Sequence, residues 1–470
     1  MVCLALERVQ PRLPARRLEL EALQHAISEA REAEALSEAH NVPYFSKLPV
    51  ELISEVFLFA TEMDSAFPAL ACLICPAWRA VALSLSFIWQ CVTLSNRNPV
   101  RKLKLWQERS KHRITCLRIR HTISMPQLSD ALAVSGPSFL ASLKSLHCDM
   151  DVLALTDRLL FMPNLQDLDL EDVLLSPRNW HQHDSTPIQI GVLVPLNRMS
   201  SIRSFTLDHV IVDWSFVTPR LSQLRILVIR SLEGPSIQQM CALLAGNPHL
   251  KKVILETGLV IEEEGFSRKD RILLSQLSHL ELLGPMNAAS LVGQLSLPRL
   301  ECFAVSHSLS LADRVMHALE PSPVALTEFS MDTCSFSAVH LAPFLQTMPR
   351  LTKLEITHSA SAIDSVVYAV AGTQNINGET RLVCPALKHV NFSHCLNLNG
   401  GPLVRLVKPR LTEIVDASSS RSPVAPAKID VVLIDGCPKI DPSVPEWLRN
   451  RVRRVSCIYM TRKEARQIRQ

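Results

Sequence analysis

Glycine and tyrosine are both scarce in this sequence, with 13 Gly and 3 Tyr among 470 residues. So little glycine excludes a collagen-like chain and a glycine-rich low-complexity scaffold. Hydrophobic residues make up 47% of the chain, which is too much apolar material for an intrinsically disordered protein. The length excludes a small disulfide-stapled domain. The remaining possibilities are several folded domains or one elongated array of repeats.

Sequence motifs for catalysis are also absent. The chain contains no Gly-x-Ser-x-Gly nucleophile elbow, no His-Glu-x-x-His motif and no phosphate-binding glycine loop. Cys72-x-x-Cys75 lacks a second pair of ligands at a suitable spacing, so it does not predict a zinc site. His181 and His183 lie in a polar stretch that is more typical of an exposed loop. We therefore expect a protein that is not an enzyme and that binds no cofactor or metal.

The cysteines indicate a reducing compartment. There are 13, an odd number, and they are dispersed from Cys3 to Cys457. This pattern is typical of reduced, buried thiols and not of a secreted disulfide framework. A signal peptide is not expected, because Glu7 and Arg8 interrupt the short apolar start of the chain. We therefore expect a cytoplasmic or nuclear protein.

One stretch is apolar enough to require comparison with a membrane span. Between Ala66 and Leu94 the only charged residue is Arg79, and a span needs roughly 20 residues. However, Pro68 and Pro76 interrupt a helix there, and a central charge costs at least ~2.5 kcal/mol in a bilayer. The stretch therefore predicts a pair of buried helices and no membrane association.

Residues 1–43 predict an N-terminal amphipathic helix, centred on residues 16–40. Leu20, Leu23, Ile27 and Ala30 recur at spacings of three and four. Such a helix either forms a short coiled coil that dimerises the chain or packs on the next domain. The apolar stripe ends after about two heptads, which is too short for a sustained coiled coil. Packing is favoured, and we expect no stable homo-oligomer.

Residues 44–95 predict a small all-α domain. It carries five short apolar motifs in a fixed order, namely Leu48-Pro49, Glu51-Leu52-Ile53, Val56-Phe57, Ile74-Cys75-Pro76-Ala77-Trp78-Arg79 and Phe87-Ile88-Trp89. The first three motifs place their apolar side chains on one broad face of a helix. A domain of this size cannot bury so much apolar surface internally. An exposed apolar patch of this kind indicates a partner site.

These five motifs resemble the F-box, and a short helix followed by an F-box is similar to fungal F-box proteins of the basidiomycete type. Pro76 departs from the family pattern, which usually has a basic residue there. The resemblance implies that the segment binds a Skp-family adaptor, which links it to a cullin and a RING ubiquitin ligase. The docking residues it implies are Leu48, Pro49, Leu52, Ile53, Val56, Phe57, Ile74, Cys75, Trp78, Arg79 and Trp89. The alternative is an ordinary helical hairpin packed on the rest of the chain.

Residues 96–444 repeat the pattern L-x-x-L-x-L twelve times, and leucine makes up 71 of the 470 residues. The first copy ends in Leu117-x-Ile119 and the last in Val432-x-Ile434, while the third is read at Leu165-x-x-Leu168-x-Leu170. Most copies begin 22 to 29 residues apart, a spacing typical of leucine-rich repeats. Three longer gaps hold polar or Pro-rich segments at 179–189, 373–380 and 418–428, where we expect insertions.

The alternation within each copy places apolar side chains on one face of a strand. Stacked strands would form a parallel sheet on a concave face, with helical returns on the convex side. The predicted fold class is therefore mixed α/β, with an N-terminal helix, a small all-α F-box and an irregular leucine-rich-repeat α/β solenoid. Cys334, Cys395 and Cys437 fall at the Asn/Cys position of the repeat, where we expect small buried residues.

Strand positions that point away from the core would form the target-binding face. They mix charged, small and apolar side chains, as suits protein recognition. The candidates are Arg118, Asp169, Thr206, Glu281, Glu355 and Asn391, with Val228, Ile254, Ala304 and Ser330 between them.

Residues 445–470 form a basic C-terminal segment with 8 basic and 2 acidic side chains, whereas the whole chain has a net charge of +4. Residues 1–46 carry −2, so the middle of the chain is neutral, which argues against a nucleic-acid-binding surface. We interpret the segment as a solvated cap over the last repeat. The alternative is a nuclear-import signal or a site for an acidic partner.

Together these features predict the substrate-recognition subunit of an SCF-type (cullin–RING) ubiquitin ligase, in which the repeats bind a protein target of unknown identity. Such a chain would position its target and would not supply a nucleophile. The first alternative is a leucine-rich-repeat scaffold unconnected with ubiquitin. The second is a nucleic-acid-associated protein that uses the basic C-terminus.

Overall fold

A computed structural model describes residues 48–458, except for 121, 137–138, 140–141, 150–171, 176–200, 209–211, 213, 232–233, 258–270, 285–287, 308–311, 320–324, 377–378 and 412–425. The chain divides into two compact units between Trp89 and Gln90. We call residues 48–89 the helical unit and residues 90–458 the sheet unit. The predicted N-terminal helix lies outside the described residues.

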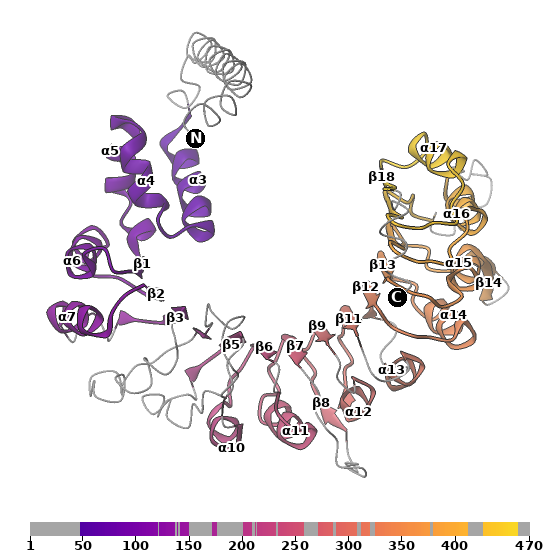
Figure 1. The fold of residues 1–470 in the computed structure, drawn as a ribbon, viewed down its shortest axis with the longest axis horizontal. Helices are drawn as coiled ribbons and strands as arrows, with labels where there is room; N and C mark the ends of the chain where they lie inside the picture. The colour runs from indigo at the N-terminus through magenta and orange to yellow at the C-terminus, as the bar shows by residue number, and fades with distance from the viewer. Residues whose placement is uncertain are drawn as a thin grey trace, which may run out of the picture. The chain divides into compact units, whose positions relative to one another are not determined.

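Three helices and a final turn form the helical unit (Figure 1): α3 (Val50–Met63), α4 (Phe67–Ile74), α5 (Pro76–Ser84) and the 3₁₀ turn η2 (Ser86–Trp89). Phe57 packs between Phe67 and Trp78, with ring centroids 5.3 and 5.0 Å away. The Trp89 indole N–H donates to the Ala82 carbonyl at 2.8 Å, which ties the final turn to α5. The centre of this small unit is therefore aromatic.

The apolar stretch from Ala66 to Leu94 is divided among two helices, a turn and a strand. Cys75 is extended between α4 and α5, and its sulfur accepts the Trp78 amide at 3.4 Å. Pro76 is the first residue of α5, where its missing N–H costs nothing. Cys75 and Pro76 therefore separate two helices, but these helices are not buried as predicted, because Leu70, Leu73 and Ile74 of α4 are exposed. Within the described residues, no helix combines the length and the apolar character needed to cross a membrane.

The sheet unit is built on one parallel sheet of fourteen strands whose order follows the chain (Figure 1). The strands are β1 (Cys91–Leu94), β2 (Cys116–Arg120), β3 (Ser145–Asp149), β4 (Asp172–Leu175), β5 (Ser204–Asp208), β6 (Ile226–Ser231), β7 (Lys252–Thr257), β9 (His279–Leu283), β11 (Cys302–Ser306), β12 (Glu328–Asp332), β13 (Lys353–Thr357), β16 (His389–Asn391), β17 (Val431–Leu433) and β18 (Arg454–Ser456). The mixed α/β class with a large parallel sheet is therefore confirmed.

Helices cover one face of this sheet and lie on the outer side of its curve (Figure 1). They are α6 (Pro99–Arg109), α7 (Met125–Ser135), α10 (Trp214–Val217), α11 (Ile237–Ala245), α12 (Ala288–Gly293), α13 (Ala312–Leu319), α14 (Ala338–Gln346), α15 (Ile363–Ala371), α16 (Gly400–Val407) and α17 (Ser443–Arg449). We call the opposite face of the sheet, which these helices leave uncovered, the open face.

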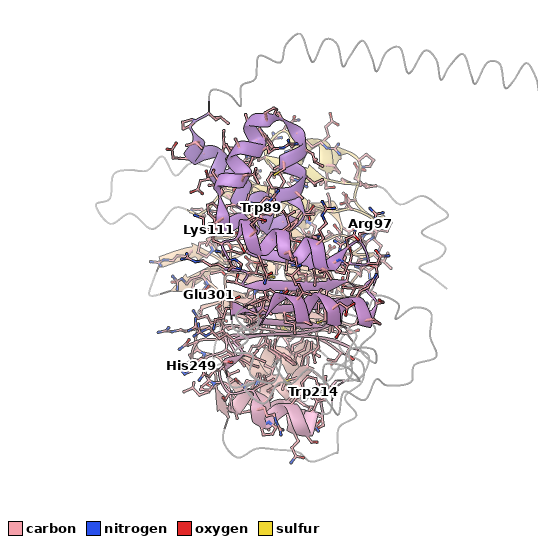
Figure 2. The ribbon with its side chains drawn as sticks, turned by 90° about the vertical axis from the view of Figure 1, so that its left-hand side faces the viewer. Trp89, Arg97, Lys111, Trp214, His249 and Glu301 are labelled. Atoms are coloured by element: carbon pink, nitrogen blue, oxygen red, sulfur yellow. The ribbon has the colours of Figure 1, made fainter. Side chains whose placement is uncertain are left out.

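All strands of the sheet run in the same direction, so the two edges of the unit differ. Lys111, His249 and Glu301, which precede strands, lie along one edge in Figure 2. Arg97 and Trp214, which follow strands, lie at the opposite edge.

The strands pair so that equivalent apolar positions of the repeat pattern stand side by side. Leu117 pairs with Leu146, and Leu280 pairs with Phe303. The same row continues through Phe329, Leu354, Val390 and Val432, all buried beneath the sheet. The L-x-x-L-x-L pattern thus predicts both the strands and their register at these positions.

The third copy of the pattern is an exception. The strand between β3 and β5 is Asp172–Leu175, in which Val173 pairs with Leu146 and with Phe205. The predicted strand at Leu168 lies outside the described residues. Val173-x-Leu175 alternates exactly as Leu168-x-Leu170 does, so apolar alternation alone could not choose between the two registers.

Two further strands extend the sheet past the predicted boundaries. β1 lies within the segment 44–95 that was assigned to the F-box, and β18 lies within the predicted tail 445–470. Trp89 stands three residues before Val92 in β1, where the pattern requires an aliphatic residue, and Val452 stands three residues before Val455 in β18. These substitutions hide both strands from a search for leucine.

The predicted insertion at 373–380 forms an antiparallel hairpin of β14 (Thr373–Ile376) and β15 (Glu379–Leu382). A second small pair, β8 (Ile272–Leu273) and β10 (Leu295–Ser296), is parallel. The insertion at 179–189 and most of the one at 418–428 lie outside the described residues.

Cysteines bridge neighbouring repeats inside the sheet unit. Cys334, Cys395 and Cys437 are buried, as the pattern predicts. The Cys395 thiol donates to the Ile356 carbonyl at 3.1 Å, and the Cys437 thiol donates to the Phe392 carbonyl at 3.0 Å. Each thiol thus satisfies a carbonyl of the preceding repeat.

Arg410 is buried, and its guanidinium donates its hydrogen bonds to backbone carbonyls and not to a carboxylate. Its guanidinium donates to the carbonyls of Leu406 at 2.8 Å and Val383 at 2.7 Å. Burial lowers the pKa of Arg410. The side chain ties the end of α16 to the residues that follow the β14–β15 hairpin.

Asn247 is fully buried beside α11 and joins two repeats. Its amide nitrogen donates to the carbonyls of Leu221 and Leu243, both at 2.8 Å. Its carbonyl accepts the Leu224 amide at 2.8 Å. One side chain therefore satisfies three backbone groups that no solvent reaches.

We expect Asn247→Ala to destabilise the sheet unit by at least about 3 kcal/mol, because it leaves three buried backbone groups without partners. Urea unfolding followed by circular dichroism measures the loss. Asn397→Ala is the matched control, since Asn397 also donates to a backbone carbonyl but is solvent-accessible. Equal unfolding midpoints for the two variants would contradict this account of Asn247.

Candidate functional site

The helical unit exposes an extensive apolar surface. Most of the large hydrophobic side chains that are exposed within the described residues belong to it. They are Leu48, Val50, Leu52, Val56, Leu58, Phe59, Met63, Leu70, Leu73, Ile74, Leu83 and Phe87, which we call the apolar surface. Phe59 is 66% exposed and Leu73 is 75% exposed. A concentration of exposed apolar side chains of this kind indicates a protein-interaction site.

Hydroxyl groups on α3 do not break up this surface. The Ser54 hydroxyl donates to the Val50 carbonyl and the Thr61 hydroxyl donates to the Phe57 carbonyl, both at 2.7 Å. Each hydroxyl is satisfied within its own helix. These side chains therefore need no partner from outside the helix.

The residues that the F-box resemblance implies as docking residues fall into two groups. Leu48, Pro49, Leu52, Val56, Ile74 and Arg79 are exposed, and Cys75 and Trp78 are half-buried. Ile53, Phe57 and Trp89 are buried inside the helical unit. Only the first group is accessible for direct contact with a partner, and the other three lie in the core of the helical unit.

Sequence reasoning missed part of the apolar surface. Phe59, Met63, Leu70 and Leu73 are exposed but were not named as candidates. For Phe59 and Met63 the signal was present, because α3 carries apolar residues around more of its circumference than one buried face requires.

The open face of the sheet carries the predicted target-binding positions. Arg118, Thr206, Glu281, Glu355 and Asn391 are half-buried and alternate with buried residues along their strands. Asp169 lies outside the described residues, and Leu174 occupies the equivalent place beside Thr206. Val228 and Ile254 form an apolar part of the face and are largely covered.

Glu355 is the centre of a charged group on the open face. The Lys353 ammonium lies 2.9 Å from its carboxylate, and His389 lies 3.5 Å away. Burial alone would lower the pKa of Lys353, but the carboxylates of Glu355 and Glu328 raise it. The pKa of His389 is lowered, chiefly by burial. This group therefore pairs the Lys353 ammonium with the Glu355 carboxylate beside the His389 imidazole.

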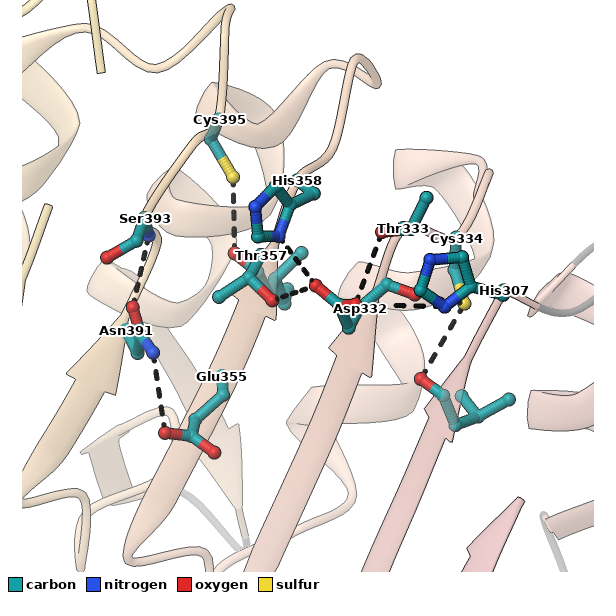
Figure 3. A network of polar contacts seen from close by, with 12 residues as sticks. His307, Asp332, Thr333, Cys334, Glu355, Thr357, His358, Asn391, Ser393 and Cys395 are labelled. Carbon is teal, nitrogen blue, oxygen red and sulfur yellow. Dashed lines mark hydrogen bonds and ion pairs between the residues drawn. The ribbon is translucent and has the colours of Figure 1, made fainter. Parts of the chain in front are cut away.

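Asp332 is the centre of a second polar group, at the end of β12 (Figure 3). Its carboxylate accepts hydrogen bonds from the Thr357 hydroxyl at 2.5 Å and from His358 Nδ1 at 2.8 Å. The His358 ring stacks on His394, with centroids 4.4 Å apart. Burial alone would raise the pKa of Asp332, but these hydrogen bonds outweigh it and lower the pKa.

Within the part of the chain that is described, no three His, Cys, Asp or Glu side chains come together as metal ligands. The open face presents charges and hydrogen-bonding groups in fixed positions, as suits recognition of a protein surface.

Comparison of the sequence with protein-family models and with curated proteins finds no match.

Two phenylalanines on α3 provide a matched pair for testing the division between core and surface. We expect Phe57→Ala to destabilise the helical unit by about 3–5 kcal/mol, because it removes a fully buried ring. Phe59→Ala should leave stability nearly unchanged. Hydrogen exchange of the amides of α3, α4 and α5 measures both effects. Equal loss of protection in the two variants would contradict the assignment.

We expect stability to fall at acid pH through Asp332. Because the folded pKa lies below the unfolded value of about 3.9, ionised Asp332 stabilises the fold above that value, and the contribution is lost as pH falls through the folded pKa. Asp332→Asn should lack this component. Urea midpoints compared between about pH 5 and pH 2 measure it, and parallel curves for the two proteins would refute it.

Proposed function

We propose that this protein is the substrate-recognition subunit of an SCF-type cullin–RING ubiquitin ligase. In this proposal the helical unit is an F-box that binds a Skp-family adaptor. The sheet unit is an irregular leucine-rich-repeat solenoid whose open face binds a protein target. The observation that carries the proposal is the apolar surface of the helical unit.

The size of the apolar surface supports a stable partner and not a passing contact. Burying a large apolar side chain is worth about 1.5–3 kcal/mol, and Leu52, Phe59 and Leu73 are each at least half exposed. An aromatic core of Phe57, Phe67 and Trp78 holds the surface from beneath. This arrangement supports the docking role that the F-box motifs imply.

The sheet unit suits the second half of the role. Parallel strands fix the spacing of the side chains on the open face, so a target would meet a preformed surface. Catalysis would then result from holding the target near the ubiquitin-conjugating enzyme. The leucine-rich-repeat scaffold without a ligase remains the competing function, and adaptor binding separates the two.

We expect the full chain, co-expressed with a Skp-family adaptor, to purify as a stoichiometric complex. Leu52→Asp and Leu73→Asp should each weaken adaptor binding at least about 100-fold, because an unpaired carboxylate in an apolar interface costs several kcal/mol. Calorimetric titration of the adaptor measures the affinity.

Val134→Asp is the matched control, since Val134 is a similarly exposed aliphatic residue on α7 of the sheet unit. It should bind the adaptor as the wild type does. If the folded wild type fails to bind, the ligase function is excluded and the scaffold function is left. Equal weakening by Val134→Asp would show that the effect is not specific to the apolar surface.

A further inference from the structure

Two cysteines lie side by side at the start of the sheet unit. Cys91 of β1 pairs directly with Cys116 of β2, and their sulfur atoms are 3.1 Å apart. Both side chains are half-buried, and Cys116 lies on the same face of β2 as Arg118, opposite the buried Leu117. The two residues are 25 positions apart in the chain, so only the pairing of the strands brings them together.

We propose that Cys91 and Cys116 form a thiol–disulfide exchange site that is oxidised by low-molecular-weight disulfides such as glutathione disulfide. Neighbouring strands lie about 4.7–4.9 Å apart, which falls within the range of about 4.4–6.8 Å between the Cα atoms of a disulfide. The sulfur atoms would have to close from 3.1 Å to about 2.05 Å. Rotation of the two half-buried side chains about their Cα–Cβ bonds can supply this movement.

The surroundings assign different roles to the two cysteines. The Cys91 thiol donates a hydrogen bond to the Cys116 sulfur, which stabilises a thiolate at Cys116. This hydrogen bond, together with the positive charge of Arg118 and the neighbouring His147, lowers the pKa of Cys116 to about 6. The same hydrogen bond and burial raise the pKa of Cys91. Cys116 is therefore the attacking group, and Cys91 is the resolving group.

The exchange runs in two balanced steps. The Cys116 thiolate attacks one sulfur of glutathione disulfide and breaks its S–S bond, and the first glutathione leaves as a thiolate that takes up a proton. Cys91 then loses its proton, attacks the Cys116 sulfur and displaces the second glutathione. The protein loses two hydrogens and two electrons, and one small disulfide is reduced to two thiols.

Cys302 shows that an open-face cysteine does not acquire this character by position alone. It starts β11 at the place in the register that Cys116 occupies at the start of β2. The charges that act on it include those of Glu328 and Glu281, whereas those that act on Cys116 are those of Arg118 and His147. Burial and these carboxylates raise the pKa of Cys302 to about 11. A cysteine at the same strand position thus has a lowered thiol pKa at one end of the sheet and a raised thiol pKa further along it.

Reaction of the reduced full chain with glutathione disulfide tests the proposal. After the remaining thiols are blocked with N-ethylmaleimide, peptide mass spectrometry reports the state of each cysteine. In the wild type we expect a Cys91–Cys116 cross-link and no lasting glutathione adduct. Cys91→Ser should trap glutathione on Cys116, and Cys116→Ser should leave Cys91 unmodified. Cys302→Ser, the control, should cross-link as the wild type does.

Rates provide a second readout that does not need the cross-link. At pH 7, Cys116 should react with glutathione disulfide at least about tenfold faster than Cys302, because its larger thiolate fraction outweighs its lower nucleophilicity. Reaction of Cys116 at the rate of Cys302 would overturn the proposal. A stable glutathione adduct on Cys116 of the wild type would overturn it as well, since Cys91 would then not resolve it.

Discussion

Lateral hydrogen bonding between parallel strands is the constraint on which the sheet unit depends. A single strand and its helix cannot bury their own apolar face, so each repeat is stable only against its neighbours. The register that pairs Leu280 with Phe303, and Phe303 with Phe329, forms one row of strand positions whose apolar side chains build the core. Chemical variety is confined to the open face, where Glu355 and Asp332 organise separate polar groups.

The helical unit meets the opposite constraint, because it is too small to cover its own apolar residues. Phe57 and Trp89 lie in its core, and the Ser54 and Thr61 hydroxyls of α3 donate their hydrogen bonds within the helix. What is left outside is the apolar surface, beside which α3 exposes Glu51, Glu55 and Glu62. Under the proposed function, the helical unit would recognise the adaptor by apolar contact and the open face would recognise the target by charge.

The sequence predicts the sheet well because each strand repeats one local rule. Leu117, Leu354 and Val432 could be placed from apolar alternation alone, and the parallel order followed from the repeat. Alternation could not fix β4, where two registers fit equally. The burial of Arg410 could not be predicted either, since its partners are carbonyls brought together only by the fold. In the helical unit, motif matching did not separate buried Phe57 from exposed Phe59, because one helix carries both.

The last strand of the sheet, β18, lies within the basic C-terminal segment. Within the described residues β18 pairs only with β17, so its outer backbone groups form an edge that another strand could extend. Arg451, Arg453 and Arg454 are exposed around this edge. Two such edges brought together would place like charges side by side. The arginines therefore oppose the joining of two copies of the chain through this edge.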